Sequence, residues 1–166
     1  MFYSLSHSLS HFSKLRSVIL NYFGTFESPI YITGNALKSY DYLQPCISET
    51  LRLYPTLAMN ARIAVTDTSL PCGGGIDGLS PVFVASGTKL QVSSYVTHRL
   101  KDVWGEDAEE WRPERWEGKT TGWETGHLPF SRGPRSCLRR KLDYYRPWVI
   151  SRTDVRLLQN NLQPQP

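Results

Sequence analysis

A single cysteine follows a glycine turn in the sequence Phe130-Ser131-Arg132-Gly133-Pro134-Arg135-Ser136-Cys137-Leu138-Arg139. The residues ahead of the turn are typical of an extended segment, and those after the cysteine are typical of the start of a helix. Arg135 and Arg139 flank Cys137, and positive neighbours favour the thiolate form of a cysteine. Because a thiolate is a nucleophile or a metal ligand, this loop is the first candidate for a chemical site.

Length and composition are those of one ordinary globular domain. The chain has 166 residues, of which 40% are hydrophobic and 20% charged, and this is enough to bury a core. The net charge of +4 is a mild excess, without a run of like charge that would predict nucleic-acid binding. The charge pattern therefore predicts no nucleic-acid partner. Cys46, Cys72 and Cys137 are irregularly spaced, so we expect free thiols and a reducing compartment.

The two ends of the chain are predicted to be disordered. Residues 1–13 mix serine and histidine with scattered apolar residues and are expected to form a disordered leader, and residues 160–166 a disordered tail. The N-terminus lacks the pattern of a signal peptide, and the chain has no run of about 18 apolar residues that could span a membrane. These features predict no membrane anchor and a cytoplasmic location for this chain.

Two amphipathic helices are predicted in the first third of the chain, separated by a loop over residues 25–35. The first helix covers residues 14–23 and ends at Gly24, and the second covers residues 41–53, with Pro45 tolerated in its first turn. The residues expected on their buried faces are Leu15, Val18, Ile19 and Tyr22 in the first helix and Leu43, Ile47, Leu51 and Tyr54 in the second.

Glu49 and Arg52 lie on the other face of the second predicted helix. They are three residues apart and are therefore neighbours on the helix surface. An isolated pair of this kind is usually a solvated salt bridge that contributes little to stability. A buried, structural pair is the alternative, and it requires additional partners from elsewhere in the chain.

The apolar pattern between residues 59 and 96 changes to a period of two, which predicts strands. We expect strands at residues 62–65 and 89–96 and a hairpin over residues 68–84 with a glycine-rich tip at residues 73–78. The glycines are not followed by the Gly-Lys-Ser/Thr ending of a phosphate loop, so an ordinary hairpin tip is predicted. His98 is not expected to bind a metal, because no second ligand lies at ligand spacing.

Three motifs in order resemble those of the cytochromes P-450. They are E-x-x-R at residues 49–52, P-E-R-W at residues 113–116 and F-x-x-G-x-R-x-C at residues 130–137. The resemblance implies a mainly α fold with a small β-sheet, forming the C-terminal portion of the cytochrome P-450 fold over residues 14–159. Its parts would be the E-x-x-R helix, β hairpins, a meander, the cysteine loop and a degenerate final helix.

The resemblance also implies a function. The amino-acid sequence of residues 70–88 resembles that of the fungal branch of the family that hydroxylates alkanes and fatty acids. It implies a haem-thiolate monooxygenase that oxygenates C–H bonds of alkyl-chain substrates, with haem b (iron protoporphyrin IX) as cofactor and dioxygen as oxidant. Electrons would come from NADPH through an NADPH–cytochrome P-450 reductase, and full-length relatives are expected at the endoplasmic reticulum membrane.

Roles for individual residues follow from the same resemblance. Cys137 would be the axial ligand of the haem iron, with Phe130 beside the sulfur and Gly133 in the turn. Arg135 and Arg62 match the positions that hydrogen-bond the haem propionates. The remaining implied sets are an apolar wall for the substrate, Leu57, Ala58 and Met59, and a buried structural triad, Glu49, Arg52 and Arg115.

Departures from the family pattern leave a second interpretation open. Arg139 stands where the family has a glycine, and Pro147 falls inside the final helix expected over residues 138–159. The central helix whose acid–alcohol pair delivers protons has no counterpart here, so no catalytic residue is expected in this chain. The alternative to a monooxygenase is a non-catalytic remnant or interaction fragment that does not bind haem, and whether this chain is itself an enzyme stays open.

Overall fold

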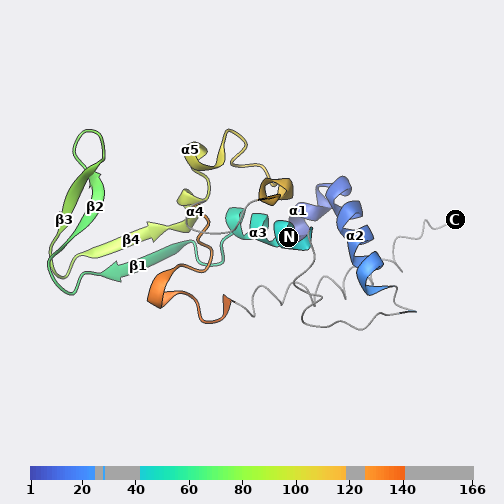
Figure 1. Ribbon diagram of the computed structural model, residues 1–166, viewed down its shortest axis with the longest axis horizontal. Coiled ribbons are helices and arrows are strands. Elements are labelled where there is room, and N and C mark those ends of the chain that lie inside the picture. The colour runs from blue at the N-terminus through green and yellow to red at the C-terminus, as the bar shows by residue number, and fades with distance from the viewer. Residues whose placement is uncertain (25–27, 29–41, 119–125, 141–166) are drawn as a thin grey trace.

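The computed structural model describes residues 1–24, 28, 42–118 and 126–140 of the chain. The described elements lie in a row (Figure 1). A β hairpin stands at one end, a second pair of strands follows, and the helices fill the other end. The final described segment, residues 126–140, lies below the second pair of strands (Figure 1).

The core lies where three helices meet. These are α1 (Phe2–Ser6), α2 (Leu9–Phe23) and α3 (Leu43–Leu53). Apolar side chains recur at helical spacing on α2 and α3, and burying these faces against each other is what stabilises such short helices. The buried cluster consists of Leu5, Leu15, Ile19, Tyr42, Leu43, Cys46 and Ile47.

The N-terminal segment is part of this core, so the prediction of a disordered leader over residues 1–13 is wrong. Residues 2–6 and 9–13 are helical, and Leu5 is only 2% exposed. The scattered apolar residues that looked irregular in sequence include Leu5, which packs in the same cluster as Leu15 and Leu43. The physical reason is that one anchoring leucine, supported by neighbouring helices, offsets the weak helix propensity of the serines around it.

The prediction that Tyr22 and Tyr54 lie on the buried faces of their helices is also wrong. Tyr22 is 49% exposed and Tyr54 is 53% exposed, while Leu15, Ile19, Leu43 and Ile47 are buried as expected. Tyr22 lies in the last turn of α2, and Tyr54 lies just beyond the end of α3. The predicted loop at residues 25–35 lies outside the described residues except for Ser28.

The strands form two separate antiparallel pairs. β1 (Met59–Ile63) pairs with β4 (Lys89–Ser93), and β2 (Thr68–Gly74) pairs with β3 (Ser80–Val84) as a hairpin inserted between them. Arg62 faces Leu90 in the first pair. The strand predicted at 62–65 therefore begins earlier, and the one predicted at 89–96 ends at Ser93, where Ser93 caps a short helix by accepting from the amide of Val96.

Glycine is required at one position of the hairpin tip. Gly75 has a φ of 76°, and a Cβ there would lie 2.7 Å from Oγ of Ser80. Such a contact, in a left-handed backbone conformation, excludes other residues without rearrangement. The glycine-rich tip is therefore a structural turn between β2 and β3, as the hairpin prediction required.

Short helical turns carry the chain from the strands to the cysteine. They are α4 (Ser94–Thr97), α5 (Lys101–Trp104), the 3-10 turn η2 (Pro113–Trp116) and the 3-10 turn η4 (Gly133–Arg135). The turn η2 packs against α3, so the P-E-R-W segment lies beside the E-x-x-R segment. Of the final helix predicted over residues 138–159, only Leu138, Arg139 and Arg140 fall within the described residues.

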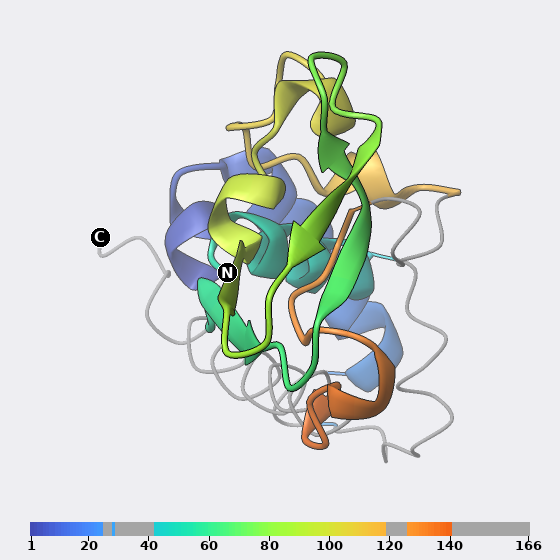
Figure 2. The same ribbon diagram turned by 90° about the vertical axis from the view of Figure 1, so that its left-hand side faces the viewer.

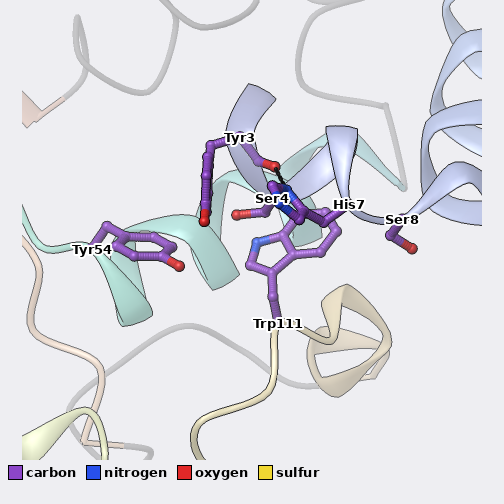
Figure 3. Close-up of a pocket in the computed structure, with 6 residues that line it drawn as sticks. All are labelled: Tyr3, Ser4, His7, Ser8, Tyr54 and Trp111. Atoms are coloured by element: carbon purple, nitrogen blue, oxygen red, sulfur yellow. Dashed lines mark hydrogen bonds between the residues drawn. The ribbon is translucent and has the colours of Figure 1, made fainter.

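A shallow hollow lies between α1 and the end of α3. It is lined by Tyr3, Ser4, His7, Ser8, Tyr54 and Trp111 (Figure 3). The indole N–H of Trp111 donates to the hydroxyl of Thr50 at 3.2 Å, and Nδ1 of His7 hydrogen-bonds the carbonyl of Tyr3 at 2.8 Å. No residue of the segment 126–140, called the cysteine segment below, lines this hollow.

The packing of α1 can be tested with two leucines of the same segment. Leu5→Ala should destabilise the chain by about 2–5 kcal/mol, because it empties a buried position in the helical core. Leu9→Ala is the matched control, since Leu9 is 77% exposed and its loss should change stability by less than about 0.5 kcal/mol. Urea unfolding followed by circular dichroism measures both, and equally small losses would mean that α1 does not pack on the core.

Candidate functional site

The guanidinium of Arg52 is saturated with hydrogen bonds in the interior. Its Nε and Nη2 donate to the two oxygens of Glu49 at 2.9 and 2.8 Å, a bidentate pairing. The remaining N–H groups donate to three backbone carbonyls, those of His98 (2.7 Å), Ala108 (2.6 Å) and Glu110 (3.0 Å). Both charged side chains are completely buried, so this pair joins α3 to residues 98–110.

Arg115 is the second cation on the same carboxylate. Its Nε lies 3.3 Å from Oε1 of Glu49, and its Nη1 donates to the carbonyl of Trp104 at 2.7 Å and to Oδ1 of Asp107 at 2.9 Å. Glu49 also accepts from the indole N–H of Trp116 at 3.0 Å and from the amide of Arg112 at 3.0 Å. The structure thus brings the three residues of the expected triad into contact.

These contacts explain how three charged side chains are accommodated in the interior. Moving an isolated charge into an apolar interior costs several kcal/mol, and only opposite charges with well-formed hydrogen bonds compensate for that cost. Here the carboxylate of Glu49 receives five N–H donors. Since the donors come from α3 and from residues 112–116, the irregular chain between α5 and η2 is fixed to the helix by this one group.

His98 lies at the edge of the triad and is fully buried. Its Nδ1 lies 3.1 Å from the carbonyl of Arg52, and its Nε2 accepts a hydrogen bond from the amide of Leu128 at 2.9 Å. Burial lowers the pKa of His98 to about 4, and the cations of Arg52 and Arg99 act in the same direction. His98 is therefore a neutral imidazole that joins α3 to the cysteine segment.

A second buried histidine, His127, lies next to His98. The two rings are 5.4 Å apart, and the His127 ring is 4.5 Å from that of Trp116. Burial lowers the pKa of His127 to about 3, with His98 and Arg52 adding to the effect, although a hydrogen bond to the backbone of Ser48 opposes it. His127 therefore attaches the start of the cysteine segment to α3 at a second point.

The cysteine segment folds back on itself. The amide of Cys137 donates to the carbonyl of Phe130 at 2.9 Å, and the amide of Ser131 donates to the carbonyl of Leu128 at 3.2 Å. Ser131 and Gly133 both have positive φ, 57° and 75°, which produces the sharp turn. Cys137 lies on the surface at the end of this turn, and Leu138 beside it is 103% exposed.

The other sequence-predicted residues are placed as follows. Phe130 is half-buried, whereas Gly133 and Arg135 are exposed in η4. Arg62 is exposed on β1, and its Nη1 donates to the carbonyl of Ala61 at 2.9 Å. Leu57, Ala58 and Met59 are exposed just before and at the start of β1, with Leu57 at 55% and Met59 at 54%.

Comparison with known proteins identifies the family. Residues 1–142 match the family model for cytochrome P450. The chain belongs to the cytochrome P450 family. It is 46% identical over 159 residues to the cytochrome P450 monooxygenase g430 of Fusarium sp, an alignment that covers 96% of this chain and 27% of the relative.

Two further relatives give the same assignment. Cytochrome P450 52A1 of Candida tropicalis is 41% identical over 173 residues, covering 100% of this chain and 31% of the relative. Cytochrome P450 monooxygenase alt2 of Alternaria solani is 46% identical over 140 residues, covering 83% of this chain and 26% of the relative. The chain thus spans about a quarter to a third of the length of these curated relatives.

The family implies haem as cofactor and a redox partner, and the described residues fit one part of that requirement. A haem-thiolate site takes a single cysteine sulfur from the protein, and Cys137 is a free, exposed cysteine at the end of a tight turn. Within the described ranges, no cluster of three or more His, Cys, Asp or Glu side chains could hold a metal ion, and no helix is long and apolar enough to cross a membrane.

The sequence pattern does not reveal the roles of His98, His127 and Asp107. Neither histidine has a local pattern that signals burial, because each is buried by segments distant in the sequence. His98 Nε2 contacts a residue 30 positions away, and Asp107 pairs with Arg115 at 2.9 Å and Arg112 at 2.7 Å within a segment without regular structure.

Removing the charge of Glu49 should unfold much of the protein. Glu49→Gln leaves the buried guanidinium of Arg52 without a counter-ion and leaves Arg115 with Asp107 alone, so we expect a loss of about 3–5 kcal/mol in the free energy of unfolding. Glu109→Gln is the control, because Glu109 pairs with Arg99 but its side chain is 70% exposed, and its loss should be under about 1 kcal/mol. Urea titration measures both, and comparable losses would contradict a buried lock.

Acid should destabilise the fold through the two histidines. Their pKa values in the folded chain, about 4 for His98 and about 3 for His127, lie below the ordinary value of 6.5, so the unfolded chain binds protons that the folded chain excludes. Stability is therefore complete above about pH 6.5 and falls toward about pH 4, by about 1.4 kcal/mol per pH unit for each histidine.

Urea unfolding at several pH values between about 7 and about 5 measures this slope. The variant His127→Phe should show about half the slope, because only one of the two depressed pKa values remains. An unchanged slope in His127→Phe would mean that His127 titrates normally in the folded chain.

Proposed function

We propose that this chain provides the proximal, cysteine-bearing part of a haem-thiolate monooxygenase that oxygenates alkyl-chain substrates. The observation that carries the proposal is the exposed Cys137 on a turn whose start is hydrogen-bonded to His98, which is itself hydrogen-bonded to Arg52 of the buried Glu49–Arg52–Arg115 cluster. A rigid support beneath one accessible sulfur is what a metal-ligating thiolate needs, since loosely held ligands lose geometry and affinity.

Each residue would then have a distinct task. Cys137 would bind the iron of haem b through its sulfur, and Phe130 would exclude water from that sulfur. Arg135 and Arg62 would hold the propionates, for which exposed guanidiniums are suitable donors. Bound haem supplies dioxygen chemistry on C–H bonds, with the thiolate donating electron density to the iron. Glu49, Arg52 and Arg115 would hold the surrounding chain in place and take no part in the reaction.

The substrate class rests on exposed apolar side chains near β1. Leu57 and Met59 present aliphatic surface on each side of Ala58, whose carbonyl accepts from the amide of Tyr95 at 3.3 Å and so is fixed at the β4–α4 junction. Such a surface suits a flexible hydrocarbon chain, because apolar contact is non-directional and scales with area. The resemblance of the sequence of residues 70–88 to the fungal branch of the family supports alkanes or fatty acids as the substrate class. Electrons would come from NADPH through a partner reductase, at the endoplasmic reticulum membrane in full-length relatives.

A non-catalytic fragment that does not bind haem is the second candidate. The observation that favours it is Arg139, which stands where the family pattern has glycine two residues after the cysteine. Arg139 is exposed, as is Leu138 between it and Cys137. A long cationic side chain at this position would oppose the close approach of an apolar ring. In this case the chain would keep the fold of residues 42–118 and lack the cofactor.

Titration of the purified chain with haem separates the two candidates. The ferrous–carbon monoxide complex should show the red-shifted Soret band of thiolate ligation, and Cys137→Ser should remove that band without changing the circular dichroism spectrum. Cys72→Ser is the matched control, because Cys72 is also exposed but lies on β2, and it should leave the band unchanged.

The variant Arg139→Gly extends the same measurement. If Arg139 obstructs the ring, haem affinity should rise by about tenfold in this variant, which is the effect of about 1.4 kcal/mol. Absence of the thiolate band in both the parent chain and Arg139→Gly would exclude haem-thiolate ligation by this chain and favour the non-catalytic fragment.

A further inference from the structure

We propose that His98 is a positioning residue for Cys137. In this role its buried, neutral imidazole transmits the geometry of the Glu49–Arg52–Arg115 cluster to the start of the cysteine segment. The role deepens the proposed haem-thiolate function and rests on it for its purpose, but its geometry is independent of any cofactor. His98 is a single side chain that contacts α3 and the cysteine segment at the same time.

The hydrogen bonds define which ring nitrogen carries the proton. The amide of Leu128 is a donor, so Nε2 of His98, 2.9 Å away, must be an unprotonated acceptor. The proton therefore resides on Nδ1, which donates to the carbonyl of Arg52 at 3.1 Å. Arg52 returns a hydrogen bond from Nη1 to the carbonyl of His98 at 2.7 Å. This reciprocal pair fixes the ring in one orientation and one tautomer.

A short series of backbone contacts continues from the ring to the cysteine. Leu128, held by His98, accepts from the amide of Ser131 at 3.2 Å and so begins the turn. Phe130, two residues after Leu128, accepts from the amide of Cys137 at 2.9 Å. Since only eight residues separate Leu128 from Cys137, and two of them have a left-handed backbone conformation, a shift at Leu128 moves the cysteine with it.

The surroundings of His98 exclude a mobile or solvated ring. His98 is 0% exposed, and the centroid of its ring lies 6.3 Å from that of Trp104 and 5.4 Å from that of His127. Gly126, which precedes His127, approaches α5 closely. A Cβ added at Gly126 would lie 3.2 Å from a methyl group of Val103. The charged groups nearest the ring are Arg52 and Arg99, both cations, which disfavour a second proton on it.

Two amide variants separate the contacts of the two ring nitrogens. An asparagine amide occupies nearly the position of Nδ1, so His98→Asn keeps the donor to Arg52 and loses the acceptor for Leu128. A glutamine amide reaches the position of Nε2, so His98→Gln keeps an acceptor for Leu128. Amide hydrogen exchange of the full chain, resolved by residue with NMR, measures the outcome without haem.

We expect the amides of Leu128 and Cys137 to exchange about tenfold faster in His98→Asn and within about threefold of the parent chain in His98→Gln, as loss of one buried hydrogen bond implies. The amide of Tyr54, bonded to the carbonyl of Thr50 at 2.8 Å, is the internal control and should be unchanged in both variants. In the haem-loaded chain, His98→Asn should also lose part of the thiolate-type Soret band.

Three results would overturn the proposal. They are unchanged exchange at Cys137 in His98→Asn, equal acceleration in the two variants, and acceleration at Tyr54 as well, which would indicate general unfolding. If the parent chain binds no haem, the proposed function fails, while the exchange rates still decide whether His98 positions Cys137.

Discussion

The carboxylate of Glu49 is the group on which the rest of this structure depends. It is completely buried and receives five N–H donors, from Arg52, Arg112, Arg115 and Trp116. No regular secondary structure holds residues 105–112, so their position is set by hydrogen bonds to this group and to Arg52. A buried charge is a costly way to hold a chain, but it is specific, since only one arrangement satisfies every donor.

The same cluster determines where the cysteine lies. Arg52 exchanges hydrogen bonds with His98, and His98 binds Leu128, so the path from the buried carboxylate to the sulfur consists of polar contacts between segments far apart in sequence. In Figure 2 the segment 126–140, drawn in orange, starts near α3, drawn in teal, and then curves away from it. The two ends of the segment differ in burial, because the end attached through His127 is buried and the end with Cys137 is exposed.

The sequence predicts local structure far better than it predicts these contacts. Helical periodicity predicts α3 and the burial of Leu43 and Ile47 on it, and the period-two pattern predicts the hairpin β2–β3. The pair Glu49 and Arg52, in contrast, looks like a solvated salt bridge by spacing alone, and only the P-E-R-W resemblance suggested a third partner. The burial of Leu5 and His127 could not be predicted, because both are covered by segments that no local pattern brings near.

Folding and cofactor binding are separable properties of this chain. The donors to Glu49 come from α3 and from residues 112–116, and the departure from the family pattern at Arg139 lies in the exposed part of the cysteine segment. A substitution there acts on what approaches Cys137 and leaves the buried cluster its partners. The family's fold can therefore persist in a sequence that has changed its affinity for haem, and an intact Glu49–Arg52–Arg115 cluster is evidence for the fold alone. Evidence for the chemistry has to come from the sulfur of Cys137 itself.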